Sequence, residues 1–169
     1  MKILETERTI LREVTTDDCE FILNLLNQPS FIKFIGDRNL RTVEQARDYI
    51  ESRFTHNYKQ FGFGMYAADL KETNETIGIC GFVKRDSLPE ADIGFALLPQ
   101  FERKGYAFES AAATLLYGIE KLNFKRVLAI TSKDNFASGR LLEKLGFTFE
   151  RFIKMTDDAE EIKLFSTAC

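Results

Sequence analysis

Cysteine, proline and long apolar runs are scarce in this sequence of 169 residues. Its three cysteines, Cys19, Cys80 and Cys169, are scattered without the paired spacing of a disulfide framework or a metal cage, so we expect free thiols in a reducing compartment. With only three prolines and no Pro/Gly/Ser-rich linker, residues 1–169 are expected to form a single domain. No apolar run is long enough to span a membrane, and the apolar start is too short for a secretory signal. These absences favour a cytoplasmic protein that makes no membrane contact.

An excess of basic residues is also missing. The chain carries 23 Lys and Arg against 26 Asp and Glu, a net charge of −3. Broad nucleic-acid binding needs a basic surface that displaces counterions, so we expect no nucleic-acid partner. A local basic pocket for a phosphorylated ligand remains compatible with this balance. Tryptophan is absent, but 16 phenylalanines supply core-filling side chains without polar atoms that need partners.

The hydrophobic periodicity predicts an α/β (α+β) fold: a mixed, mostly antiparallel sheet of about six to seven strands flanked by about four helices. Strands are expected at Thr9–Val14, Phe63–Leu70, Thr76–Lys84, Ala91–Leu98, Arg126–Thr131, Thr148–Met155 and Glu160–Ser166. Helices are expected from Thr15 or Thr16 to Pro29, from Thr42 past Phe54, over Tyr106–Leu122 and over Phe136–Leu145. Thr76–Lys84 is apolar on both faces, as a covered central strand would be. The strand at 91–98, the next helix and the strand at 126–131 form one parallel crossover, expected to be right-handed.

Local signals place the helix ends. Thr42 and Gln45 form a capping-box pattern, and Asn135 can cap the helix that follows it. Gly146 is expected to end that helix in a left-handed conformation.

The most informative segment joins the strand ending at Leu98 to the helix starting at Tyr106. It carries Arg103, Lys104 and Gly105, and the first amides of a helix lack internal partners in a region of partial positive charge. Such a start is suited to a phosphate or pyrophosphate. The segment is neither a G-x-G-x-x-G fingerprint nor a Walker loop. A plain strand–helix loop with exposed basic residues would have the same sequence, so the loop alone leaves both interpretations open.

A second segment carries Asn135 and Ser138 at the start of the helix after the other parallel strand. Both segments therefore open at one edge of the sheet, where parallel strands diverge and ligands usually bind. A simple N-cap and a solvated serine would also account for these two residues.

Taken in order, these segments resemble the GNAT superfamily of acyl-CoA N-acyltransferases, and most closely its branch of ribosomal-protein N-terminal acetyltransferases. The resemblance covers roughly residues 6–165. It rests on Glu7–Arg12, Ile93-Gly94-Phe95 with Leu98-Pro99, Gly105-Tyr106-Ala107 with Glu109 and Ala111, and Asn135, Ser138 and Leu145-Gly146-Phe147.

The resemblance implies a single N-acetyltransferase domain that uses acetyl-CoA, with splayed parallel strands forming the cofactor crevice. Amides of Arg103–Ala107 would hold the pyrophosphate, and the edge of Phe95–Leu98 would pair with the amides of the pantetheine arm. Asn135 would contact the pantetheine arm, and Ser138 would lie near the thioester sulfur. The implied cofactor-binding residues are Phe95, Leu97, Leu98, Arg103, Lys104, Gly105, Tyr106, Ala107, Asn135 and Ser138. No metal site is implied, and a monomer or a homodimer is compatible.

Three positions depart from the family pattern. Glu102 stands where a basic or amide residue is common, and we expect it to point away from the phosphates. Arg103 stands where a glycine is common, and an arginine is tolerated at this position if its φ is negative. Leu142 replaces a tyrosine proposed as general acid in many members, which leaves Ser138 as the candidate for the acid or for a positioning group.

The implied reaction is direct attack of an amine on the thioester. Because amines are mostly protonated at neutral pH, a proton must leave, and we expect Asp92 to take it through water. A carboxylate that is merely solvated, or that only attracts the ammonium, is the alternative. His56 is expected to be exposed, and Cys80 to lie in the core rather than act as a nucleophile.

The acceptor is a protein N-terminal α-amine or a small-molecule amine. Its site is expected between residues 30–41 and the turn at 156–159. Phe31, Phe34, Arg38 and Arg41 would hold a peptide or an acidic small molecule, or would only form a hydrophobic staple with solvated charges. A non-catalytic acyl-CoA sensor and a nucleotide-binding domain are the competing functions.

Overall fold

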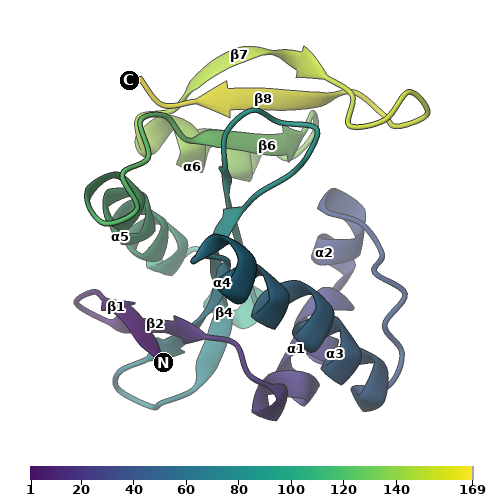
Figure 1. The fold of residues 1–169 in the computed structure, drawn as a ribbon, viewed down its shortest axis with the longest axis vertical. Helices are drawn as coiled ribbons and strands as arrows, with labels where there is room; N and C mark the ends of the chain where they lie inside the picture. The colour runs from purple at the N-terminus through teal and green to yellow at the C-terminus, as the bar shows by residue number, and fades with distance from the viewer. Residues whose placement is uncertain (169) are drawn as a thin grey trace.

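The computed structural model describes residues 1–168, so Cys169 lies outside the described residues. Within them an eight-stranded sheet has the order β1-β2-β3-β4-β5-β6-β8-β7 (Figure 1). The strands are β1 Lys2–Glu5, β2 Thr9–Glu13, β3 Met65–Leu70, β4 Thr76–Val83, β5 Asp92–Leu97, β6 Leu128–Ser132, β7 Thr148–Ile153 and β8 Ile162–Ser166. Neighbouring strands are antiparallel except β5 and β6. The predicted mixed, mostly antiparallel sheet is confirmed.

The helical segments are η1 Thr16–Asp18, α1 Cys19–Leu26, α2 Pro29–Phe34, α3 Val43–Tyr49, η2 Ile50–Thr55, α4 His56–Phe61, η3 Pro99–Phe101, α5 Tyr106–Glu120 and α6 Phe136–Lys144. The first helix runs on from η1, whose Thr15 forms a capping box with Asp18. The α3 capping box predicted at Thr42 and Gln45 is confirmed, with the Gln45 amide donating to Thr42 Oγ1 over 3.1 Å. Residues 43–61 form one continuous helix, because η2 is a π-helical stretch between α3 and α4.

The parallel pair β5 and β6 splays apart almost at once. The two strands are in register only at Asp92 and Leu128, where the Leu128 amide donates to the Ala91 carbonyl over 3.0 Å. From there the rest of β5 runs unpaired on its β6 side, so its amides and carbonyls face a gap in the sheet.

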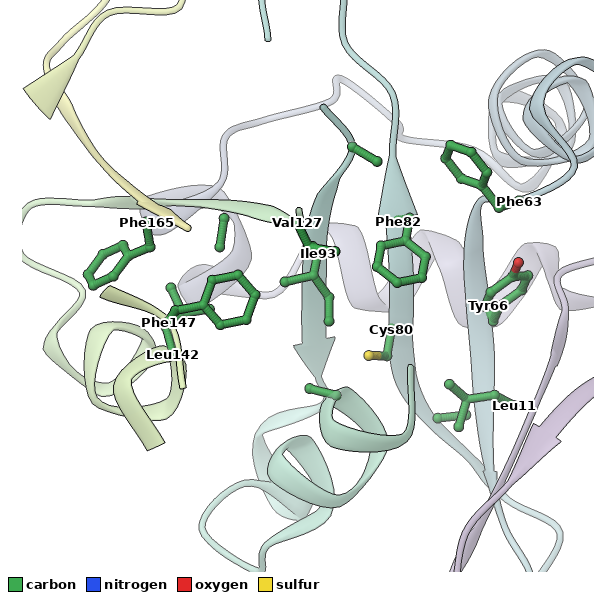
Figure 2. Close-up of a cluster of buried hydrophobic side chains, with 14 of the residues drawn as sticks. Leu11, Phe63, Tyr66, Cys80, Phe82, Ile93, Val127, Leu142, Phe147 and Phe165 are labelled. Carbon is green, nitrogen blue, oxygen red and sulfur yellow. The ribbon is translucent and has the colours of Figure 1, made fainter. Parts of the chain in front are cut away.

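Helices cover both faces of the sheet (Figure 1). On one face α5 and α6 pack over a cluster that extends from Leu11 on β2 to Phe165 on β8, as Figure 2 shows. A Cβ added at Gly118 of α5 would lie 2.5 Å from the Phe82 ring, so this glycine lets the helix approach the sheet closely. On the other face α1 and α3 pack against Ala67 and Ile79. Both faces of the sheet are thereby covered by helices beside the gap between β5 and β6.

Two elements differ from the sequence prediction. β1 adds a strand to the predicted count of six to seven, because the short run Lys2–Glu5 finds a partner in β2. Pro29 ends the first helix as predicted, but it also occupies the first turn of α2, where a missing N–H costs nothing. None of the helices within residues 1–168 combines the length and the apolar character needed to span a bilayer.

Candidate active site

The gap between β5 and β6 opens into a crevice of about 460 Å³. Its walls come from α2, the end of β5, the loop before α5, and the first turns of α5 and α6. The lining residues are Ser30, Phe31, Phe34, Ile35, Phe95, Ala96, Leu97, Glu102, Arg103, Gly105, Ala107, Phe108, Asn135, Ala137, Ser138, Leu141 and Lys144. Seven of the ten predicted cofactor-binding residues are therefore brought together: Phe95, Leu97, Arg103, Gly105, Ala107, Asn135 and Ser138.

The other three predicted residues, Leu98, Lys104 and Tyr106, do not line the crevice. Leu98 is buried on the α1 side of the sheet. The Lys104 ammonium lies 5.9 Å from the centre of the Phe101 ring, and the Tyr106 ring lies 4.4 Å below the Arg8 guanidinium. Their side chains are thus engaged elsewhere, although the backbone of Lys104 and Tyr106 belongs to the loop.

The loop from Glu102 to Ala107 takes an unusual backbone path. Gly105 has a φ of 85° at the N-cap of α5, and no side chain caps this helix. Arg103 has a φ of 60°, so the condition of a negative φ, under which a residue other than glycine is unstrained there, is not met. Within residues 1–168 no group accepts a hydrogen bond from the amides of Lys104 and Gly105. Together with the unpartnered first amides of α5, they form a concentration of N–H donors at the mouth of the crevice.

Glu102 also lines this crevice, and its orientation away from the phosphates stays a prediction. The crevice therefore contains one acidic residue beside Arg103 and Lys144.

Arg8, from the turn between β1 and β2, fixes the loop from behind. Its Nη1 donates to the Lys104 carbonyl over 3.0 Å, and its Nε donates to Glu109 Oε2 over 2.7 Å. Glu109 also accepts from the Thr6 hydroxyl and the Arg8 amide. Partial burial works to raise the pKa of Glu109, but these hydrogen bonds outweigh it and the pKa is lowered. Sequence reasoning missed this role of Arg8, since only the fold brings residues 8 and 109 together.

The start of α6 forms the opposite wall. Asn135 caps this helix as predicted, its Oδ1 accepting from the Ser138 amide over 3.2 Å. The Ser138 hydroxyl has no hydrogen-bond partner within the described residues and belongs to the crevice lining. Leu142 is 1% exposed and packs in the core, so its position does not face the crevice. The neighbouring residue that lines the crevice is Leu141.

A second cavity, of about 780 Å³, lies between the sheet and the helices α1 to α4. It shares Phe31, Ile35, Phe95 and Ala96 with the crevice, so the two spaces meet at the middle of β5. The turn at 156–159 contributes no lining residue, and the wall expected there comes from Val83–Asp86 instead. The two spaces and their meeting point suit two substrates that react with each other.

Of the residues proposed to hold the acceptor, Phe31 and Arg38 line this second cavity. Phe34 lines the crevice instead, and Arg41 is held in an ion pair with Asp37 over 2.6 Å. His56 is exposed as expected, yet it also lines the cavity.

Asp92 lies on the same face of β5 as Gly94 and Ala96, which line the second cavity, but it is not itself a lining residue of either space. It is 1% exposed, and its Oδ1 accepts from Arg85 Nε over 2.9 Å. Burial raises the pKa of Asp92, although the charge of Arg85 opposes the shift. A carboxylate with a raised pKa is a stronger base than an ordinary aspartate, and Arg85, which lines the cavity, connects it to that space.

Cys80 is buried in the core as predicted. Burial raises the pKa of its thiol to about 12, so the thiolate needed for nucleophilic attack is not available at neutral pH.

Known proteins are similar to this chain both in sequence and in fold. Residues 8–148 match the family model described as the acetyltransferase (GNAT) domain. The uncharacterized N-acetyltransferase YoaA of Bacillus subtilis (strain 168) is 33% identical over 153 residues, which are 90% of this chain and 86% of that protein. The [ribosomal protein uS5]-alanine N-acetyltransferase of Escherichia coli (strain K12) is 31% identical over 112 residues, which are 65% of this chain and 56% of that protein.

Among solved structures, RimL, a ribosomal L7/L12 alpha-N-protein acetyltransferase in complex with coenzyme A, superposes with a TM-score of 0.85 at 18% identity. The match covers 99% of this chain and 98% of that chain. At this identity the likeness concerns the fold.

Proposed function

Because this chain belongs to the GNAT family of acetyltransferases, we propose that it transfers the acetyl group of acetyl-CoA directly to a primary amine. The observation that carries this proposal is the pair of spaces that meet at Phe95 and Ala96. One has the features of a coenzyme A site, and the other has room for an amine acceptor.

The residues of the crevice fit coenzyme A. The unpartnered amides around Gly105 and the start of α5 suit a pyrophosphate, with Arg103 and Lys144 adding positive charge. The unpaired edge of β5 at Phe95 and Leu97 offers backbone groups to the pantetheine amides, as an added strand would use them. Asn135 and Ser138 lie on the opposite wall. The solved RimL structure with coenzyme A supports this assignment by fold alone.

The bound acetyl-CoA supplies an activated acyl group as a thioester. The acceptor amine, entering from the second cavity, loses a proton to Asp92 through water and forms the new C–N bond as the C–S bond breaks. The departing thiolate takes a proton, for which Ser138 is the donor or the group that positions it. Ser138 lines the crevice, and Asp92, which lines neither space, would be reached from the second cavity beside Arg85.

Two acceptor classes remain in the proposal. A protein N-terminal α-amine is supported by the relative that acts on the alanine of ribosomal protein uS5. A small-molecule amine is supported by the volume of the second cavity, about 780 Å³, which suits a metabolite as well as a few residues of peptide.

The proposal is tested by replacing Gly105 with Glu. At a φ of 85° any side chain is strained, and a carboxylate there repels a pyrophosphate. We expect coenzyme A binding, measured by calorimetry, to be lost while the circular dichroism spectrum is retained. Gly146→Glu is the matched control, since Gly146 also has a positive φ but lies away from the crevice. Binding that survives in Gly105→Glu would contradict the site.

Thiol release from acetyl-CoA across a panel of amines, with mass spectrometry of the products, tests the transfer itself. A panel that spans peptides with free N-termini, amino acids, polyamines and aminoglycosides covers both acceptor classes. Binding of coenzyme A without thiol release for any amine would overturn the proposed transfer and would favour a sensor.

A further inference from the structure

The second cavity has a strongly basic lining in a protein that is acidic overall. Its charged side chains are Arg38, Arg53, Lys84, Arg85 and Asp86, four cations against one anion, with His56 beside them. The chain as a whole has a net charge of −3. Positive charge is therefore concentrated where the acceptor enters, and such a concentration selects the charge of a ligand.

We propose that the acceptor is an anionic amine, a primary amine that carries one or more carboxylates close to the reacting nitrogen. This inference rests on the proposed function and specifies its acceptor. The carboxylates would lie against the guanidinium groups of Arg38 and Arg53, with the amine directed toward Ala96 on β5.

Two of the cations are available for a ligand. Arg38, from the segment between α2 and α3, and Arg53, from the π-helical stretch η2, form no ion pair within residues 1–168. By contrast, Arg41 close by is neutralised by Asp37. A guanidinium binds a carboxylate through two parallel hydrogen bonds, a geometry that neither water nor a neutral amide reproduces.

A third cation is held in place by the protein. Arg85 donates its Nε to the buried Asp92, which fixes the guanidinium at the cavity wall. Lys84 donates to the carbonyls of Leu88 and Pro89 and so is oriented by the same loop. The pair of Arg85 with Asp92 is close to neutral, so the net attraction for an anion comes mainly from Arg38, Arg53 and Lys84.

A cationic cavity also disfavours the alternative acceptors. Polyamines and aminoglycosides bring several positive charges, and like charges in a partly enclosed space repel each other. An acidic acceptor instead gains attraction from its carboxylates, which offsets the repulsion of its own ammonium before the proton leaves.

The test compares acceptors that differ only in charge. The peptides Ser-Asp-Glu-Ala, Ser-Asn-Gln-Ala and Ser-Lys-Arg-Ala, and glutamate with its diamide glutaminamide, in which both carboxylates are replaced by amides, are assayed with acetyl-CoA at low ionic strength. The peptide and amino-acid arms separate a protein N-terminus from a free metabolite as the source of the carboxylate. In at least one arm, kcat/KM for the acidic acceptor should exceed that for its amide counterpart by roughly tenfold, and the excess should shrink in high salt.

Charge-removing variants connect the preference to the cavity. Arg53→Ala and Arg38→Ala should each reduce the ratio of acidic to amide kcat/KM several-fold, by roughly three- to tenfold. Arg47→Ala is the matched control, because Arg47 is an exposed arginine of α3 that lies outside the cavity lining, and it should leave the ratio unchanged. Equal kcat/KM for acidic and amide acceptors, or a faster reaction of the basic peptide, would overturn the inference.

Binding of unreactive ligands separates this inference from the proposed function. N-acetylated forms of the same peptides and amino acids are titrated into the protein with coenzyme A present, with calorimetry as the readout. Tighter binding of the acidic forms that is lost in Arg53→Ala supports a cationic cavity that takes an anionic acceptor. If no acceptor then releases thiol, only the proposed transfer is overturned. Equal binding of acidic and amide forms would overturn the anionic acceptor even where transfer is observed.

Discussion

Asp92 is the residue whose environment bears most directly on the chemistry. It is buried at the start of β5, and desolvation raises its pKa against the opposing charge of Arg85. If it removes the acceptor proton, activity requires its ionised form, so kcat/KM should fall as the pH drops through a pKa above the usual aspartate range. Asp92→Asn retains an oxygen that can accept from Arg85 but cannot take a proton.

The prediction for Asp92→Asn is a loss of kcat/KM of about 10² to 10⁴, together with loss of the acid limb of the pH profile. The profile over pH 4 to about 9 with a saturating acetyl-CoA concentration is the measurement. A variant that is slower but keeps the wild-type limb would show that Asp92 only positions Arg85. Arg85→Ala separates the two roles, because it removes the partner of Asp92 and leaves the carboxylate able to accept a proton.

Arg103 provides a prediction about backbone strain. Its φ of 60° lies in the left-handed region, which costs about 1 kcal/mol for a residue other than glycine. Arg103→Gly removes that strain but also increases the freedom of the unfolded chain, so we expect a gain in unfolding free energy of about 0.5 kcal/mol. Urea denaturation provides the measurement. Asn123→Gly is the control, since asparagine tolerates its φ of 59° and its substitution should gain less.

At this scale, the residues predictable from the sequence were those whose signal is local. Asn135 as a helix cap and Gly105 before α5 follow from patterns of a few residues, and both lie in the crevice. Arg8 could not be assigned, because its partners Lys104 and Glu109 are about a hundred positions away. Arg53 was likewise hidden, since its place in the cavity depends on the path of the helix that carries it.

Among the elements, the contact of the β1–β2 turn with the start of α5 has a functional consequence. Arg8 joins the Lys104 carbonyl to Glu109 and lies over Tyr106, so it holds the loop in the shape that directs its amides outward. The folded-state pKa of Glu109 is lowered. A lowered carboxylate pKa means that the contact is present above the usual pKa and is lost as the pH falls through the folded value. It is therefore intact at neutral pH.

Arg8→Ala is expected to weaken coenzyme A binding about five- to tenfold, because the loop must then be ordered by the ligand. Calorimetry at neutral pH gives the affinity, and thermal unfolding shows whether the fold is retained. Lys2→Ala is the control, since Lys2 is an exposed cation of the neighbouring strand whose ion pair with Glu5 lies on the surface. Unchanged affinity in Arg8→Ala would mean that the loop is fixed by its own backbone.

The long helix at residues 43–61 shows why elements were easier to predict than their details. The spacing of Val43, Ala46, Ile50 and Phe54 predicted a helix correctly, but no residue pattern marked the wider i→i+5 turns of the π-helical stretch Ile50–Thr55. β1 and α2 were missed because each is short and is stabilised by tertiary neighbours rather than by its own pattern.

For the whole molecule, the splay between β5 and β6 divides the sheet into two parts. β1 to β5 form one part with α1 to α5, and β6, β8 and β7 form the other with α6 (Figure 1). Within the sheet they are joined at Asp92 and Leu128, and beyond it by the cluster of side chains that reaches from Leu11 to Phe165 (Figure 2). A ligand that lies between β5 and Ser138 therefore contacts both parts at once.

This arrangement predicts that coenzyme A stabilises the sheet as a whole and not only the loop that it touches. Ligand at about 100 times its Kd should add roughly 2.7 kcal/mol to the unfolding free energy. Hydrogen exchange followed by mass spectrometry should show slower exchange at Arg103–Phe108 and also in β6 and β8, because bridging the gap suppresses the separation of the two parts. Gly105→Glu, with coenzyme A added, should show neither effect. Slower exchange confined to Arg103–Phe108 would mean that the ligand is held at the loop and does not span the gap, which would place the reacting end of acetyl-CoA away from Asp92 and Ser138.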